Sequence, residues 1–380
     1  MLCTISNGGI VPKDVTAVPA PVSCRSGQTR LESLSMPATD HSSGTRAQVL
    51  NSPILYLGKV TVTEPIARNK AGRLSGTRLK AFIFPFLYRL VRVLPVGLAL
   101  LPARLLAAIA GLLYVLPNNP LRNACEHIYQ LMPADDREPN ISPRQIYNQF
   151  LHNALGVLNN FFTLYRHGSE AVLPRIHMQT DDKTRIQSLI DTHGGIVLAV
   201  PHNIASAFSA LRIGDCFDML LVAKNSPTIE RTRIAIDFYE RMQLSLLLVR
   251  EGHPVELSRA MFTCLKGGKL VAATLDKIDR TAGQVPALLF GQTVGLSDWA
   301  ARIAARMQVP VIPAYFHSRG KDIEVSVGAA LVSHDTLRAV QHYASFFEQE
   351  ILKDPASWAY LADKHWQKVL NKAVGKDPIA

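Results

Sequence analysis

The sequence predicts an α/β fold, with a mostly parallel central sheet flanked by helices and an N-terminal helical segment that associates with membranes. Two observations predict this class. From residue 194 onward, short apolar runs alternate with amphipathic stretches, as strands and crossover helices do in parallel sheets. Ahead of them, residues 81–117 are the most apolar part of a 380-residue chain that is 48% hydrophobic. That hydrophobic content excludes a wholly disordered chain.

Residues 1–78 differ from the rest, being rich in Ser, Thr, Pro and Gly without sustained apolar periodicity. The first 80 residues hold ten Lys and Arg against four Asp and Glu, which is +6 of the net charge of +11. We expect a disordered or poorly ordered basic tail. A solvated tail, a chain that really begins near Met36 and a targeting peptide stay open. No apolar core directly follows the first charges, so no secretory signal is predicted.

Residues 81–117 fit a basic amphipathic hairpin lying in the plane of a membrane surface. Three arginines and three prolines interrupt the run, and the uncharged pieces 93–103 and 105–116 are only 11 and 12 residues long. A spanning helix needs about 20 apolar residues. Arginines can reach lipid phosphate while leucines enter the acyl layer. A spanning helix and a buried helical layer of a soluble domain remain the alternatives.

The chain divides into a tail (1–78), a helical region (79–170), an α/β domain (171–370) and a short C-terminal tail (371–380). Within the second region, apolar residues recur at helical spacing over 145–168. In the α/β domain, strands are predicted at 196–200, 218–223, 245–249, 269–275, 309–316 and 322–328. Helices are predicted between them at about 227–242, 253–266 and 297–307.

Polar residues follow four of these strands, where the active sites of parallel sheets lie. They are His202 with Asn203, Lys224 with Asn225, Arg250, and Asp276. A histidine at a strand end is well placed as a general base. Each residue alone is a weak signal, but together they form a base beside a basic rim. Such an edge suits a substrate that carries phosphate.

Other function classes are disfavoured by what the sequence lacks. There is no GxSxG, P-loop or HExxH motif. Five scattered cysteines favour a reducing compartment over a disulfide framework or a zinc site. The net charge of +11 predicts an anionic partner. A nucleic-acid-binding protein would leave residues 81–117 unexplained, and the basic residues lack RNA-binding signatures.

Seven features in order resemble the bacterial lipid A lauroyl/myristoyl acyltransferases, a family within the glycerolipid acyltransferase superfamily. The resemblance spans about residues 80–370. After the apolar segment 81–117 its parts are GGIVLAVPHN at 194–203, AKN at 223–225, LLLVREG at 246–252, LVAATLDKID at 270–279, LLFGQTVGLSDWAARIAARMQVPVIPAYF at 288–316 and FFEQEILKDPASWAYLADKHW at 346–366.

The resemblance implies roles for particular residues. His202 takes the place of the catalytic base in an H-x4-[DE] motif, and Asp276 that of a strand-end acid. Asn203, Lys224, Asn225 and Arg250 are expected to bind substrate or phosphate. Phe290 and Trp299 are expected at an acyl groove, although Trp299 stands where a small residue is typical, and a packing role is open. No metal or tightly bound cofactor is implied.

One departure concerns the acid of that motif, because position 207 holds Ala207. In one interpretation another carboxylate takes its place, with Asp215, Asp218, Asp276 and Asp279 as unranked candidates. Alternatively, the chain is a non-catalytic lipid-binding relative.

The implied reaction is direct acyl transfer from acyl-CoA or acyl-carrier protein to a hydroxyl of a lipid or glycolipid. No covalent intermediate is expected, since no activated Ser or Cys is evident. The expected location is the cytoplasmic face of the inner membrane, in a peripheral or monotopic mode. The expected partners are the acyl donor, the lipid acceptor and the membrane surface, and not nucleic acid.

Overall fold

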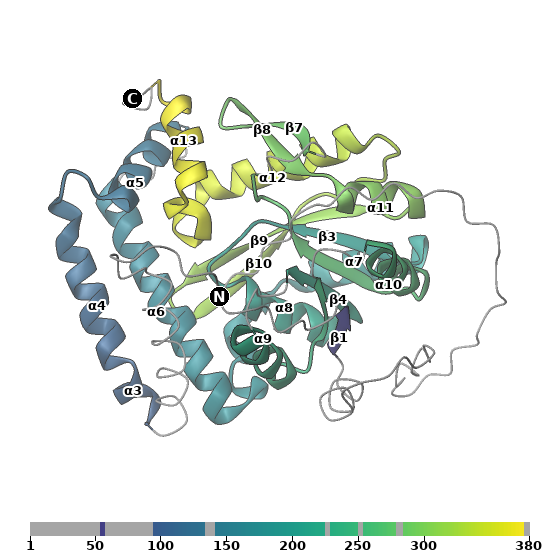
Figure 1. Cartoon of the computed structure of the whole chain (residues 1–380), viewed down its shortest axis with the longest axis horizontal. Helices are drawn as coiled ribbons and strands as arrows, with labels where there is room; N and C mark the ends of the chain where they lie inside the picture. The colour runs from purple at the N-terminus through teal and green to yellow at the C-terminus, as the bar shows by residue number, and fades with distance from the viewer. Residues whose placement is uncertain are drawn as a thin grey trace, which may run out of the picture.

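The structure is a computed structural model that describes residues 54–57, 94–133, 141–224, 229–249, 254–278 and 284–375. Its centre is an eight-stranded sheet in the order β1-β5-β4-β6-β3-β9-β10-β2 (Figure 1). The strands are β1 (Ile54–Leu57), β2 (Ile176–Met178), β3 (Ile196–Val200), β4 (Met219–Lys224), β5 (Ser245–Val249), β6 (Leu270–Thr274), β9 (Val311–Arg319) and β10 (Asp322–Val327). Every pairing is parallel except that of β9 with β10. The predicted mostly parallel sheet is therefore confirmed.

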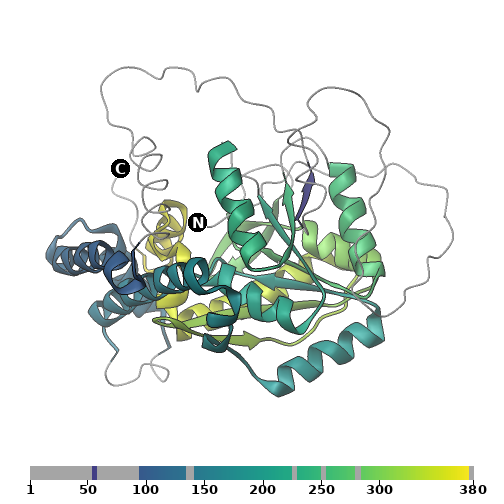
Figure 2. The same ribbon diagram turned by 90° about the horizontal axis from the view of Figure 1, so that it is seen from below.

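The sheet is covered by helices on both faces, as Figure 2 shows from below. Strand β3 is buried along its whole length, and its alternate residues enter two separate cores. One core receives α7 (Thr180–His193), α8 (Ser206–Cys216) and α9 (Ile229–Arg241). The other receives α5 (Pro120–Leu131), α10 (Pro254–Lys266), α11 (Trp299–Met307), α12 (Thr336–Lys353) and α13 (Lys364–Ala373). This double burial explains why the strands read as continuous apolar runs.

Some elements were not predicted. Strands β7 (Gln284–Leu289) and β8 (Gln292–Ser297) form a separate antiparallel hairpin before α11. Its turn places Phe290 and Gly291 at positive φ, a conformation that glycine adopts without strain. Strand β2 adds to the sheet edge, and β1 pairs with β5. The remainder of the predicted tail lies outside the described residues.

The N-terminal helices lie beside α6 (Pro143–His167) at the left of Figure 1. They are α3 (Val96–Ala99) and α4 (Leu101–Leu112), followed by the 3₁₀ turn η1 (Leu113–Val115). Residues Val96–Val115 form one stretch that is long and apolar enough to cross a membrane, judged by length and composition. The first arm of the predicted hairpin lies outside the described residues.

Two pairs of short 3₁₀ turns connect helices and strands near the sheet. Turns η2 (Ser169–Ala171) and η3 (Leu173–Arg175) connect α6 to β2. Turns η4 (Pro355–Ser357) and η5 (Ala359–Ala362) connect α12 to α13. The second pair lies against the loop that follows β3, as described next.

Candidate active site

The candidate site begins where β3 ends, with Pro201, His202 and Asn203. Because β5, β4, β6 and β3 are neighbours and parallel, their carboxyl ends share one edge of the sheet. The register pairs Val200 of β3 with Thr274 of β6, so the residues that follow these two strands meet. The predicted site residues that follow β3 and β6 therefore lie at the same edge of the sheet.

His202 and Asp276 are in direct contact at this edge. The backbone N–H of His202 donates to Asp276 Oδ1 at 2.9 Å, and its Nδ1 contacts the same oxygen. Both side chains are buried, with His202 0% exposed. A carboxylate oxygen only accepts, so Nδ1 carries the proton and Nε2 is left as an acceptor. This is the arrangement that a histidine base needs.

Asp276 is held by two tryptophans from the end of the chain. Trp358 Nε1–H donates to Asp276 Oδ2 at 2.9 Å, and Trp366 Nε1–H donates to the Asp276 carbonyl oxygen at 3.1 Å. Both indoles are fully buried. His202 and Trp358 thus satisfy the two carboxylate oxygens, which offsets the cost of burying the charge, while Trp366 holds the backbone.

Of the acids proposed to replace the one missing at position 207 that the structure describes, Asp276 is the one in contact with the imidazole. Asp215 pairs with Arg212, and Asp218 pairs with Lys269. Asp279 lies outside the described residues. Ala207 lies in the first turn of α8. The acid beside His202 therefore comes from the neighbouring strand and not from the helix that follows the histidine.

The remaining predicted site residues are placed as follows. Lys224 ends β4 at this edge, with only its backbone described, and Asn225 and Arg250 lie outside the described residues. Asn203 is buried and pairs with Trp358 in an isolated bridge. Phe290 and Trp299 are buried in the same core, where the Phe290 ring lies 6.0 Å from the Trp358 ring. A groove for an acyl chain beside them stays a prediction.

Two contacts of the imidazole were not anticipated. Thr274 Oγ1 lies 3.1 Å from His202 Nε2, and the Tyr360 ring stacks on the imidazole with 4.3 Å between centroids. For Thr274 a signal existed, because it stands two residues before Asp276 at a strand end, where alternate residues point the same way. For Tyr360, 158 positions from His202, no local signal existed.

The 354–360 segment, defined by those residues, holds the histidine loop in place. Ala359 N–H donates to the His202 carbonyl at 2.7 Å, and Ile204 N–H donates to the Ser357 carbonyl at 2.9 Å. Residues 202 to 204 thus pair with residues 357 to 359, near the C-terminal end of the chain. This pairing holds the loop that follows β3 in place.

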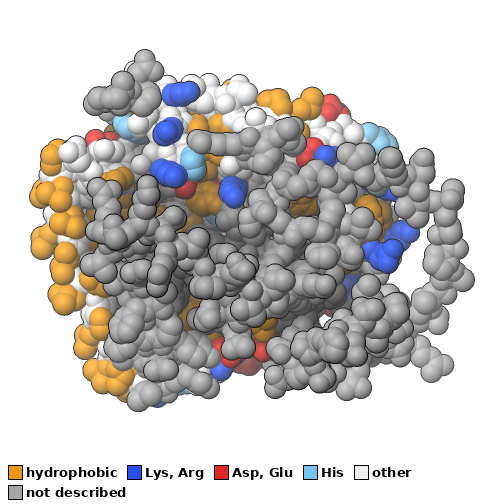
Figure 3. All heavy atoms as spheres, in the orientation of Figure 1, with side chains coloured by type: hydrophobic (Ala, Val, Ile, Leu, Met, Phe, Trp, Pro, Cys, Tyr) orange, Lys and Arg blue, Asp and Glu red, His pale blue; other side chains and the backbone are white. Residues whose placement is uncertain are grey.

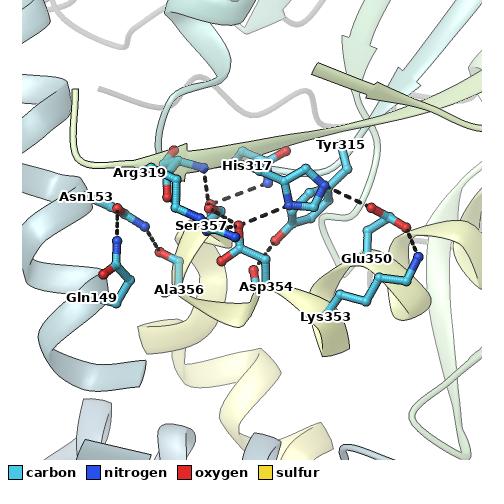
Figure 4. A network of polar contacts seen from close by, with 12 residues as sticks. Gln149, Asn153, Tyr315, His317, Arg319, Glu350, Lys353, Asp354, Ala356 and Ser357 are labelled. Carbon is cyan, nitrogen blue, oxygen red and sulfur yellow. Dashed lines mark hydrogen bonds and ion pairs between the residues drawn. The ribbon is translucent and has the colours of Figure 1, made fainter. Parts of the chain in front are cut away.

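A polar network anchors this segment to β9 (Figure 4). Asp354 Oδ2 accepts from Ser357 Oγ at 2.7 Å and from Arg319 Nη1 at 2.9 Å, and it lies 3.1 Å from His317 Nδ1. The other imidazole nitrogen of His317 lies 3.0 Å from Glu350 Oε2. Burial alone lowers the pKa of His317, but the hydrogen bonds and charges of Asp354 and Glu350 outweigh it and raise the pKa to about 9. His317 is therefore a partly buried cation between two carboxylates at neutral pH.

The cysteines in the described ranges are poor nucleophiles. Burial raises the pKa of Cys125 and of Cys264 to about 12 and raises the pKa of Cys216 as well. Their thiols are thus neutral at physiological pH. Within the same ranges, no group of three or more His, Cys, Asp or Glu side chains is arranged to hold a metal ion.

Two comparisons with known proteins bear on the identity of the chain. No curated protein matches the chain. The model of the family described as "Bacterial lipid A biosynthesis acyltransferase" matches residues 78–368, which is more than half of the chain and includes the whole of the site. The chain belongs to the bacterial lipid A biosynthesis acyltransferase family.

Proposed function

We propose that this protein moves a fatty acyl group from a thioester, acyl-CoA or acyl-carrier protein, to a hydroxyl of a lipid or glycolipid acceptor. His202 acts as the general base. The observation that carries the proposal is the contact between His202 Nδ1 and Asp276, because it leaves Nε2 free of its own proton and able to accept one. Asp276 orients the ring and stabilises the imidazolium that forms when the hydroxyl attacks.

The basic residues at the same edge would bind phosphate. Lys224 ends the strand next to β6, and Arg250 follows the strand beyond it. Both the donors and the phosphorylated acceptors of this family of reactions carry phosphate, which Arg and Lys bind by charge-assisted hydrogen bonds. Asn203 and Asn225 complete the polar rim in this proposal, and Phe290 and Trp299 border the acyl chain.

The family is membrane-associated, and α4 supplies an apolar face for that purpose. Its leucines and isoleucine are exposed over one side of the helix, as the orange side chains along the left edge of Figure 3 show: Leu101, Leu105, Leu106, Ile109 and Leu112. We propose that this face lies in the acyl layer of the cytoplasmic leaflet, with the basic charge of the chain toward anionic lipid.

The test is transfer of radiolabelled acyl groups into total membrane lipids. Acyl-CoA and acyl-carrier protein of several chain lengths are supplied to the wild type, to His202→Ala and to His334→Ala, which removes an exposed histidine elsewhere. We expect one lipid to be labelled by the wild type and by His334→Ala but not by His202→Ala. Equal labelling by His202→Ala would remove the histidine from the reaction.

The second candidate is a non-catalytic lipid-binding relative, which Ala207 and the complete burial of His202 favour. It predicts lipid binding without transfer from any donor or chain length. The same assay therefore separates the two functions.

A further inference from the structure

The outer side of α13 carries a row of three lysines. Lys364, Lys368 and Lys372 stand four residues apart, so they lie on one side of the helix, and each of them is exposed. On the same helix Trp366 and Leu370 are buried. Lys368 follows Trp366 by two residues, which is about half a helical turn, so the three lysines lie opposite the buried side. We call these three residues the α13 lysine row.

The stability of the helix itself does not account for the lysine row. No Asp or Glu stands three or four positions from any of the three lysines, and like charges four residues apart destabilise a helix. Lys364 is also the first residue of α13, where the positive end of the helix dipole disfavours a cation. Among the described residues, none of the three pairs with a carboxylate. An anionic partner on this side of α13 would therefore relieve a repulsion that the chain leaves in place.

The opposite side of α13 is in contact with the candidate site. Trp366 Nε1–H donates to the Asp276 carbonyl oxygen at 3.1 Å. Four residues before the helix begins, the Tyr360 ring stacks on the His202 imidazole with 4.3 Å between centroids. One helix, about 10–12 Å across with its side chains, thus separates the lysine row from the site. A partner bound to the row lies beside the edge at which the acyl thioester must arrive.

The lysine row and the apolar face of α4 point in different directions. Lys and Arg side chains gather over α13 on the side toward the viewer in Figure 3, whereas hydrophobic side chains line the left edge, where α4 lies. A flat membrane against α4 therefore leaves the row open to a soluble partner. The row extends over eight residues, or about 12 Å, which is long enough to pair with several acidic side chains of a protein surface.

We propose that the α13 lysine row is the docking surface for an acidic acyl-carrier protein that delivers the acyl group. Carboxylates of the carrier protein pair with the three lysines, and its flexible arm carries the thioester past α13 to His202. This inference rests on the proposed acyltransferase function and deepens it, because it selects the carrier protein over acyl-CoA as the donor. Since the pairs are exposed, they increase the rate of association more than the strength of the final complex.

Charge reversal tests the lysine row without weakening the helix. In the double variant Lys364→Glu with Lys368→Glu, the first change places an acid in the first turn and the second places an acid four residues before Lys372. Both changes favour a helix, so the fold is expected to persist. The matched control, Lys266→Glu with Arg338→Glu, makes the same change in net charge at exposed positions of α10 and α12.

The measurements use the full-length protein at low ionic strength. We expect the double variant of the row to lower kcat/KM for acyl-carrier protein at least about tenfold, with kcat at saturation unchanged. With acyl-CoA, and in the control variant with either donor, kcat/KM should change less than about twofold. Binding of holo-carrier protein without an acyl chain should weaken in parallel, and added salt should weaken wild-type binding.

Binding and transfer distinguish a failure of this inference from a failure of the proposed function. Equal binding of holo-carrier protein by the row variant and the control variant would overturn the docking surface. The docking surface would also be wrong if the row variant bound the carrier protein normally but no longer floated with vesicles of anionic lipid. Transfer from acyl-CoA by a wild type that does not bind the carrier protein would overturn the docking surface and leave the acyltransferase function. Binding that depends on the row, without transfer from any donor, would instead support the docking surface and remove the proposed function.

Discussion

At the scale of single residues, Asp276 is the side chain on which the site depends. Its two carboxylate oxygens accept from His202 on one side and from Trp358 on the other, and all three residues are buried. Because both of these partners donate hydrogen bonds, position 276 requires a side chain that accepts at both of its terminal atoms. This requirement explains how the acid next to the histidine can come from the loop that follows β6, although Ala207 stands in the usual place.

Asp276→Asn should therefore lower kcat by on the order of 10³–10⁴, with little change in KM. The asparagine amide has the same shape as the carboxylate, but its NH₂ group would face either His202 or Trp358, which are both donors. The histidine would then adopt the wrong tautomer, or the Trp358 N–H would lose its acceptor. Steady-state acyl transfer at saturating donor measures kcat. Asp181→Asn, which changes an exposed acid of α7, is the matched control. A kcat within about tenfold of the control, with the fold intact, would show that the carboxylate is not needed.

At the scale of elements, α4 packs against α6 and keeps an apolar side exposed. The two helices lie side by side (Figure 1), and Tyr147 Oη on α6 donates to the carbonyl of Ala110 on α4 at 2.6 Å. The exposed leucines and isoleucine of α4 form the apolar face that we propose for membrane attachment.

The double substitution Leu105→Asp with Leu106→Asp should release the protein from membranes. Both leucines are exposed, Leu106 at 67%, so two charges there oppose insertion without disturbing a core. Flotation with vesicles containing anionic lipid measures the bound fraction, which should fall at least about tenfold. Leu337→Asp on α12 is the control, because Leu337 is also exposed, at 52%. Equal flotation of the two variants would argue against α4 as the attachment face.

At the scale of the whole molecule, the parts predicted from the sequence are those with a local signal. Strand β5 falls on the predicted residues 245–249, and α10 (Pro254–Lys266) lies within one residue of the predicted range. Parallel strands buried on both faces give continuous apolar runs, which makes them easy to find. The strand-end rule then brought His202 and Asp276 to one edge, where they are in contact.

What the sequence did not predict depends on contacts between distant positions. Trp358 lies 82 positions from Asp276, and its role as a hydrogen-bond donor leaves no periodic trace. The β7–β8 hairpin reads as part of a mixed apolar and polar stretch, because only alternate residues of β7 are buried. Long-range pairing of this kind is set by tertiary packing and not by local propensity.

His317 links the pH of the medium to the stability of the whole fold. Its pKa in the folded protein is about 9, against 6.5 for an unperturbed histidine, because Asp354 and Glu350 hold the charged form. The stabilisation is fully present below about pH 6.5, declines as pH rises and is lost above about pH 9. The shift corresponds to on the order of 3 kcal/mol. Burial raises the pKa of Glu350, but its hydrogen bonds to His317 and Lys353 outweigh that effect and lower it. A lowered pKa of Glu350 and a raised pKa of His317 both favour the charged pair.

The melting temperature of the full-length protein should therefore fall between pH 7 and pH 9.5 more steeply in the wild type than in His317→Gln. Since His317 anchors the 354–360 segment that pairs with the His202 loop, we expect acyl transfer to decline over the same interval. Thermal unfolding followed by tryptophan fluorescence reports the first effect, because Trp358 and Trp366 are both buried beside Asp276. His334→Gln, at an exposed histidine, should behave as the wild type. A pH dependence that His317→Gln leaves unchanged would show that other groups, and not this imidazolium, set the alkaline limit of the fold.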